Sequence, residues 1–226
     1  MKINIYYRHA EGCKDGYFRP EGFSFERCLK NFLESIDGAK DVNLTLVFDG
    51  NIENDFIKNY TMYFDNVINT EYRNSLKSFL HLLDYIENQD MDENDIIYYV
   101  ENDYLHVKGW LDKVRALFST YNGIEYVSLY DHNDKYTEPQ YANLLARLIT
   151  THNSHWRNTP STCGTYMMLR STWEKDIDIW KAATGDHETF MKLNNERQRS
   201  LLTPIPGLNT HCMKTLESPT IDWSTI

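Results

Sequence analysis

Apolar positions along the first 130 residues alternate between two patterns. Short, nearly continuous apolar runs are typical of strands buried in a sheet, whereas apolar residues at every third or fourth position are typical of one helix face. A helix is predicted between Ser24, a good capping residue, and Gly38, which ends it. Strands are predicted at residues 2–7, 42–48, 62–68, 96–100 and 124–130, and further helices near residues 52–58, 76–86 and 110–117.

The run at residues 96–100 carries the most information about fold class. It is apolar throughout and is bounded on both sides by acidic residues, which is typical of a strand covered on both faces. Strands that alternate with helices imply right-handed crossovers. We therefore predict an α/β fold with a Rossmann-like, mostly parallel central sheet flanked by helices. A length of 226 residues favours one large domain over residues 1–226.

The second half of the chain breaks this alternation, and a mixed region is predicted there. Ser171-Thr172-Trp173-Glu174 matches the capping box that opens a helix. Gly185 separates that helix from another that starts near Asp186. Residues 131–139 and 153–164 are predicted as loops, residues 165–169 as a strand, and the chain after Thr203 as irregular.

Charge and composition narrow the possible functions. The formal net charge is -10, which argues against nucleic acid as a partner because a phosphate backbone requires clustered Lys and Arg. An acidic protein can still bind a phosphorylated ligand when a divalent cation supplies positive charge. No apolar run reaches membrane-spanning length, and the N-terminus lacks a signal-peptide pattern. Four scattered cysteines suit a reducing compartment. We expect a cytoplasmic protein, with peripheral membrane docking left open.

Two carboxylates follow the buried run at residues 96–100. In an open α/β sheet, ligands bind beyond the carboxyl ends of the strands, where Glu101 and Asp103 stand. Residues two apart in an extended segment point the same way. Two such carboxylates offer hard oxygen ligands to Mg²⁺ or Mn²⁺, which would bridge the phosphates of a nucleotide. Two solvated acids at a strand end are the alternative reading of the pattern.

The order of these elements resembles the GT-A glycosyltransferases. A strand ending in Asp49, a long helix, and a strand ending in Glu101-Asn102-Asp103 match the place of that family's acid-x-acid (DxD) motif. Residues 98–106, followed by Gly109-Trp110, are similar to the stretch in many family-2-like members. Glu replaces the usual first Asp, so that carboxylate would bind metal through water or contact the ribose.

This resemblance implies a set of donor-binding residues. An acid at the position of Asp49 contacts the base or ribose in GT-A enzymes, and Arg8 resembles the first nucleotide-loop position. A helix N-terminus favours anions, so the residues that open the long helix also belong to the expected donor-binding set. Alternatively, Asp49 is an ordinary turn residue, and Arg8 and Lys77 are surface cations. The implied nucleotide-sugar contacts are Arg8, Asp49, Arg73, Asn74, Lys77, Glu101 and Asn102.

The resemblance also implies a cation site. Asp103 is the expected direct ligand, with Glu101 beside it. Many GT-A enzymes supply a late histidine as a further ligand, and His211 lies in a suitable loop near the C-terminus. An imidazole ligand would shift the metal preference of the site from Mg²⁺ towards Mn²⁺. An ordinary loop histidine is the alternative reading of His211.

Catalytic and acceptor residues are expected in the second half. In inverting members an acid from the region of Asp186 and Glu188 acts as general base on the acceptor hydroxyl. Asp186 is also a good helix N-cap residue, so that role stays open. His155, Trp156 and Thr162 are predicted on the acceptor side, where Trp156 would stack on a sugar ring unless it is a core residue.

The sequence thus predicts a metal-dependent glycosyltransferase that moves a sugar, with inversion, from a UDP- or GDP-sugar to a hydroxyl. The acceptor is a saccharide, a lipid-linked group or a protein. Residues 1–130 would bind the donor and residues 131–226 the acceptor. A sugar nucleotidyltransferase is disfavoured because residues 8–20 lack a compact glycine-rich, basic run. A non-catalytic sugar- or nucleotide-binding protein and a metal-dependent phosphohydrolase or nuclease are the other rivals.

Overall fold

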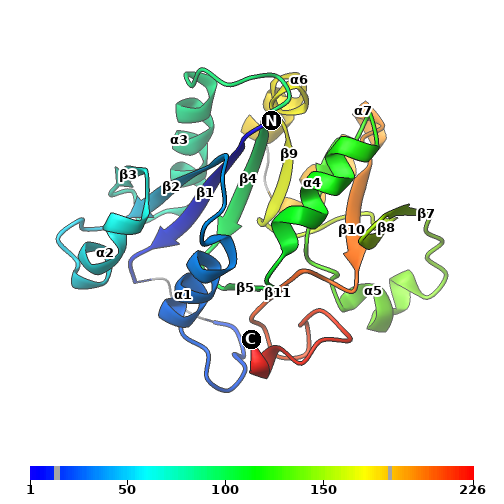
Figure 1. Cartoon of the computed structure of the whole chain (residues 1–226), viewed down its shortest axis with the longest axis horizontal. Helices are drawn as coiled ribbons and strands as arrows, with labels where there is room; N and C mark the ends of the chain where they lie inside the picture. The colour runs from blue at the N-terminus through cyan, green and yellow to red at the C-terminus, as the bar shows by residue number, and fades with distance from the viewer. Residues whose placement is uncertain (13–15, 183–184) are drawn as a thin grey trace.

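A nine-stranded sheet runs through the molecule in the order β3-β2-β1-β4-β9-β6-β10-β8-β7 (Figure 1). This computed structural model describes residues 1–12, 16–182 and 185–226. The strands of the large sheet are β1 (Ile3–Ala10), β2 (Val42–Asp49), β3 (Asn66–Thr70), β4 (Ile96–Glu101), β6 (Tyr126–Val127), β7 (Leu148–Thr151), β8 (Ser154–Asn158), β9 (Tyr166–Leu169) and β10 (Leu201–Ile205).

The strand directions confirm the predicted α/β fold with a mostly parallel sheet. Strands β3, β2, β1 and β4 pair in parallel, as consecutive crossovers require. Strands β9 and β8 are antiparallel to their neighbours, and all other strands point the same way. The carboxyl ends of β1, β2 and β4 therefore lie at one edge of the sheet.

Helices cover both faces of this sheet. The apolar side chains of α1 (Phe25–Ile36) and α4 (Trp110–Thr120) pack on one face. The other face is covered by α3 (Ser75–Glu87), α6 (Arg170–Lys181) and α7 (Asp186–Arg197). The shorter helices are α2 (Asp55–Tyr60), α5 (Asp134–Thr137) and the 3-10 helices η1 (Thr61–Tyr63), η2 (Pro139–Tyr141) and η3 (Trp223–Thr225).

Two of the helices begin where capping residues place them. The Ser24 hydroxyl accepts a hydrogen bond from the Arg27 backbone N–H at 3.0 Å, which confirms the predicted start of α1. The Asn74 side chain accepts from the Lys77 backbone N–H at 2.9 Å and caps α3. The capping box predicted at Ser171 is wrong, because α6 already begins at Arg170. Buried Arg170 holds that start through a hydrogen bond to the Ile86 carbonyl at 2.7 Å.

Several segments predicted as irregular are strands. The expected loop at residues 153–164 contains β8, which pairs with both β7 and β10. The tail after Thr203 completes β10 and forms β11 (Asn209–His211). Strand β8 forms a hairpin with the neighbouring β7, but the pairings of β8 with β10 and of β11 with β5 join distant segments, and local sequence patterns do not show such pairings. Conversely, the strand predicted at residues 62–68 begins with the 3-10 helix η1, and β6 is shorter than expected.

A small second sheet brings the end of the chain to the end of β4. Strand β11 pairs antiparallel with β5 (Tyr104–His106), and His211 stands opposite Tyr104 (Figure 1). Cys212 follows, and its thiol is 3.8 Å from that of Cys28 in a small buried cluster. Cys212 itself is only 2% exposed. No helix in the described part of the chain is long and apolar enough to cross a bilayer.

Candidate functional site

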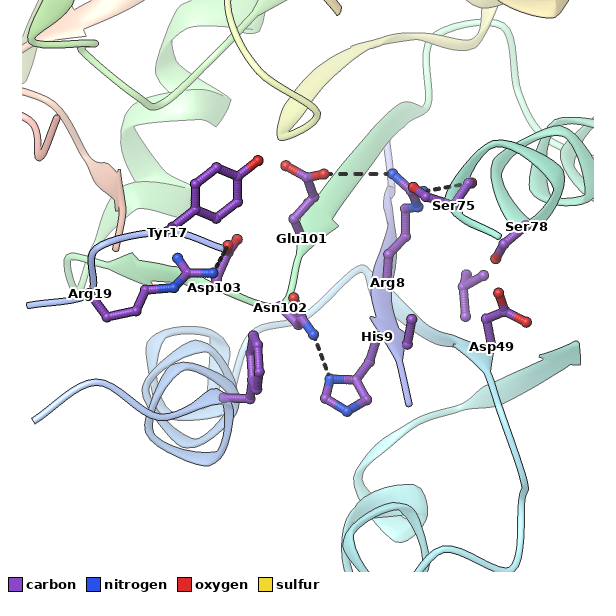
Figure 2. Close-up of a pocket in the computed structure, with 13 residues that line it drawn as sticks. Arg8, His9, Tyr17, Arg19, Asp49, Ser75, Ser78, Glu101, Asn102 and Asp103 are labelled. Carbon is purple, nitrogen blue, oxygen red and sulfur yellow. Dashed lines mark hydrogen bonds and ion pairs between the residues drawn. The ribbon is translucent and has the colours of Figure 1, made fainter. Parts of the chain in front are cut away.

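A cleft of about 860 Å³ opens at the edge where β1, β2 and β4 end (Figure 2). We call it the first pocket. The predicted residues Arg8, Asp49, Glu101, Asn102 and Asp103 all line it. The chain therefore brings together most of the residues expected to bind the donor, at the place where open α/β sheets bind ligands.

Asp103 is held by two cationic or potentially cationic partners. Its Oδ2 accepts hydrogen bonds from Arg19 Nη2 at 3.0 Å and from His211 Nε2 at 2.8 Å. Burial would raise the pKa of the Asp103 carboxyl, but His211 and Arg19 together lower it below its usual value. Asp103 is therefore a carboxylate across the neutral pH range. The His211 ring stacks on Tyr104 with a centroid distance of 4.9 Å, which fixes its orientation.

Glu101 occupies a different environment from Asp103. A turn at residues 102–103 separates the two carboxylates, so the extended geometry predicted for them is wrong, although both face the first pocket. Burial, with the negative charge of Asp103, raises the pKa of Glu101 to about 7, and Arg8 opposes this rise. The Arg8 guanidinium is 3.9 Å from the Glu101 carboxylate (Figure 2).

The Glu101 carboxylate lies directly against Gly164, a residue that the sequence did not single out. A Cβ at position 164 would stand 2.6 Å from Glu101 Oε1. We expect Gly164→Ala to turn the Glu101 carboxylate away and to lower the turnover of the predicted nucleotide-sugar donor about 10- to 100-fold, the usual scale for a misplaced group in an active site. The free energy of unfolding should change by less than about 1 kcal/mol, because only a flexible side-chain end moves.

A matched variant separates this effect from a general glycine effect. At Gly185 an added Cβ would likewise stand 2.6 Å from a carboxylate oxygen, that of exposed Glu188. Turnover and urea unfolding of Gly164→Ala and Gly185→Ala are to be measured side by side. Wild-type turnover in a folded Gly164→Ala protein would show that the position of Glu101 is unimportant, whereas a loss in Gly185→Ala would report on the second pocket, which Gly185 also lines.

Arg8 and Asn102 are both anchored at the pocket wall. Arg8 donates to the Ser75 carbonyl and hydroxyl, each at 3.3 Å, and lies over the Phe79 ring. The Asn102 amide donates to His9 Nδ1 at 2.8 Å (Figure 2). Burial lowers the pKa of His9 to about 4, so the imidazole is neutral and can accept this bond.

Asp49 is placed as predicted but is already well bonded. Its carboxylate accepts from the Thr70 hydroxyl and the Arg73 N–H, each at 3.1 Å, and from the Asn74 N–H at 3.0 Å. It thereby holds the left-handed backbone at Arg73, where φ is 49°. Arg73 and Asn74 line a neighbouring hollow with Asp49, whereas exposed Lys77 lines neither that hollow nor the first pocket.

A second pocket of about 740 Å³ adjoins the first and shares Arg8, Ser75 and Glu101 with it. Asp186, at the start of α7, lines this second pocket, and Glu188 does not. Asp186 is an exposed residue, so the loss of hydration on its pocket side is only partial. This partial loss and the charge of Glu188 raise the pKa of Asp186, and Arg8 opposes the rise. Phe79 and exposed Leu76 form an apolar wall.

Tyr166 gives the second pocket an unusual polar group. The ring is 1% exposed and stacks on Trp180 at 4.8 Å. Among the described residues, its hydroxyl has no hydrogen-bond partner. Asp186 and Arg8 both act on its pKa, which burial raises far more strongly. A buried hydroxyl without a partner in the protein is a group that a ligand can satisfy.

The predicted acceptor residues are not in this pocket. Trp156 is 0% exposed and packs in the core, so its ring has no face to offer a sugar. His155 is exposed on β8, and Thr162 is buried with its hydroxyl 2.8 Å from that of Ser128. Neither lines the first or second pocket. Stacking of Trp156 on a sugar is excluded because its segment, predicted as a loop, is the strand β8, whose pairing places the ring in the core.

The two pockets are also lined by residues that the sequence did not single out. In the sequence, Arg19 stands in a segment without a glycine-rich run, and Tyr166 stands in a predicted strand. Asp103 lies 84 residues from Arg19 along the chain, and Trp180 lies 14 residues from Tyr166, so no local spacing marks these pairs. The signal for Arg19 was its type: a cation following the first strand of a predicted phosphate-binding fold.

The residues around Asp103 suit a shared cation site. Within residues 1–12, 16–182 and 185–226, no three His, Cys, Asp or Glu side chains are arranged to hold a metal ion alone. Asp103 Oδ2 and His211 Nε2 are 2.8 Å apart in a hydrogen bond. A carboxylate and an imidazole are both metal-ligand types, so a cation bound here would replace this hydrogen bond and take its remaining ligands from a substrate.

No protein-family model matches the sequence, and no curated protein is significantly similar to it. Solved structures do match its fold. CMP:2-keto-3-deoxy-manno-octonic acid synthetase complexed with CTP has a TM-score of 0.52 and 10% identity, over 92% of this chain and 92% of that chain. GalNAc-T7 with UDP, GalNAc and Mn²⁺ has a TM-score of 0.54 and 11% identity, over 90% of this chain and 41% of that chain.

S. aureus TarS has a TM-score of 0.53 and 16% identity, over 90% of this chain and 35% of that chain. The chain thus spans the synthetase almost fully but less than half of GalNAc-T7 and TarS. At these identities the similarity shows the fold alone. The predicted GT-A-like architecture, which nucleotidyltransferases share, is confirmed.

Proposed function

We propose that the protein is a glycosyltransferase. It moves a sugar from a nucleotide-diphosphate donor, a UDP- or GDP-sugar, to a hydroxyl group of an acceptor, with inversion at the transferred carbon. A divalent cation, Mn²⁺ or Mg²⁺, binds with the donor. The observation that carries this proposal is the junction of the two pockets, where Glu101 and Arg8 are shared between a site suited to a nucleotide and one suited to a hydroxyl acceptor.

The first pocket supplies what a nucleotide diphosphate needs. Arg8 and Arg19 bring positive charge to an otherwise acidic cleft. Asp103 and His211 would hold the cation, which stabilises the negative charge on the diphosphate as it leaves. The base would lie towards Asp49, Arg73 and Asn74, where backbone and side-chain groups line the neighbouring hollow.

The second pocket is suited to an uncharged acceptor. Its carboxylates are Glu101 and Asp186, and its one cation, among the residues described as lining it, is Arg8, which already contacts Glu101. The excess negative charge of these residues repels an anionic acceptor. Leu76 and Phe79 offer an apolar wall to one face of a sugar ring, and the Tyr166 hydroxyl can bond an acceptor hydroxyl.

The reaction requires a base on the acceptor side. Asp186 accepts the proton of the acceptor hydroxyl as its oxygen attacks the donor carbon from the face opposite the diphosphate. The bond from that carbon to the diphosphate oxygen breaks, and Arg8 and Arg19 stabilise the departing charge. Attack and departure on opposite faces invert the carbon. Glu101, between the two pockets, orients Arg8.

A sugar nucleotidyltransferase is the second candidate. Two guanidinium groups in the first pocket suit a triphosphate, and the chain spans 92% of the CMP:2-keto-3-deoxy-manno-octonic acid synthetase that was solved with CTP. Against it stands the acidic second pocket, because the substrate that attacks a nucleoside triphosphate in such a reaction carries an anionic group. A non-catalytic binding protein would use the same two pockets without turnover.

The decisive experiment is a thermal-shift screen of UDP-, GDP-, CMP- and dTDP-sugars and of the four nucleoside triphosphates, with and without Mn²⁺. We expect a nucleotide-diphosphate sugar to raise the Tm in the presence of Mn²⁺, because a ligand at 100 times its Kd adds about 2.7 kcal/mol. Donor hydrolysis or transfer to sugars is then assayed. A shift with triphosphates alone would favour the nucleotidyltransferase, and binding without turnover would favour a binding protein.

A further inference from the structure

The contacts of Arg19 hold its guanidinium against the Asp103 carboxylate, a proposed cation ligand. Its Nη2 donates to Asp103 Oδ2 at 3.0 Å, and its Nη1 donates to the Cys212 carbonyl at 2.8 Å. The guanidinium also lies 4.4 Å from the centre of the Phe23 ring. Figure 2 shows the Arg19 guanidinium pointing towards Asp103, on the side of Glu101 away from Arg8.

The oxygen that Arg19 contacts is the one nearest to His211. Both Arg19 Nη2 and His211 Nε2 bond to Oδ2 of Asp103. A cation ligated by His211 and this oxygen would meet a guanidinium on the same oxygen, and two positive groups cannot share it without strong repulsion. The Asp103 and Arg19 side chains are only 10% and 13% exposed, so water screens that repulsion poorly.

We propose that Arg19 is an internal cation that occupies the metal ligands in the absence of substrate and makes cation binding depend on the nucleotide diphosphate. This inference rests on the proposed function. In the substrate-free protein Arg19 neutralises Asp103 and competes with Mn²⁺ or Mg²⁺. The diphosphate gives the Arg19 guanidinium another anionic partner, and Asp103 Oδ2 becomes available to the cation.

Thermodynamic linkage makes this a quantitative statement. If diphosphate releases Arg19 from Asp103, the nucleotide must raise the affinity for the cation, and the cation must raise the affinity for the nucleotide by the same factor. Part of that factor comes from ordinary contact between cation and phosphate. The part that depends on Arg19 is revealed when the residue is changed.

The test is the affinity for Mn²⁺, measured by the electron paramagnetic resonance signal of unbound Mn²⁺, alone and with UDP or GDP. We expect Arg19→Gln to bind Mn²⁺ alone at least tenfold more tightly than the wild type, with a smaller gain on adding nucleotide. Arg19→Lys keeps the positive charge and should resemble the wild type. Arg197→Gln, an exposed change on α7, is the matched control.

Each outcome bears on the inference. Asp103→Asn should remove the tight site from Arg19→Gln, which ties the effect to this carboxylate. If Arg19→Gln binds Mn²⁺ no more tightly than the wild type, while nucleotide and Mn²⁺ still bind together, the inference is wrong and the proposed function stands. If Mn²⁺ binds to neither protein, with or without nucleotide, both the inference and the metal-dependent function fail.

Discussion

Asp103→Asn should lower kcat/KM for the proposed transfer by about 1,000-fold, because it removes the charged ligand around which cation and diphosphate assemble. The substitution keeps the size of the side chain but loses its charge. His211 and Arg19 lower the pKa of the Asp103 carboxyl, so the wild-type group is ionised throughout the usual assay range. The loss should therefore be similar from pH 6 to pH 9.

The loss of activity must be separated from a loss of fold. Asp103→Asn leaves Arg19 without its buried counterion, and we expect the free energy of unfolding to fall by about 2 kcal/mol. Circular dichroism and urea unfolding measure this directly. Asp112→Asn, an exposed change on α4 with an Arg partner of its own, is the control and should keep full activity. A folded Asp103→Asn protein with wild-type, Mn²⁺-dependent turnover would refute the assignment.

The parts of this fold that the sequence predicted depend on local chemistry. The buried run at residues 96–100 and the capping residue Ser24 are visible because each acts within a few positions of itself. The position of Asp103 was predictable for a related reason, because it follows a strand whose apolar residues predict its burial. A ligand site at the carboxyl ends of parallel strands then follows from topology.

The parts that could not be predicted depend on contacts between distant segments. Strand β8 exists because it pairs with β10, and this pairing turned Trp156 into the core and removed it from the acceptor side. The second pocket is formed where the start of α7 meets the end of β4, so only the fold brings Asp186 near Glu101. Gly164 matters only because a carboxylate lies against it.

Asp186→Asn should lower kcat by a factor of about 100 to 10,000, the usual contribution of a general base, whereas Glu188→Gln should change kcat less than threefold. The two acids stand in the same first turn of α7, and the sequence alone left the choice between them open. The structure favours Asp186, since it lines the second pocket beside Glu101 and Glu188 does not. Both variants remove one negative charge from the first turn of α7, so a difference between their kcat values reports the effect of position.

The pH dependence gives this prediction a second, independent test. A base works in its ionised form, so kcat of the wild type should be constant above the pKa of Asp186 and should fall as the pH drops through it. Loss of hydration and the nearby Glu188 raise that pKa, which places the fall at higher pH than for an ordinary aspartate. In Asp186→Asn this acidic fall should disappear from the residual rate. An unchanged acidic fall in Asp186→Asn, together with a large loss in Glu188→Gln, would move the base to Glu188.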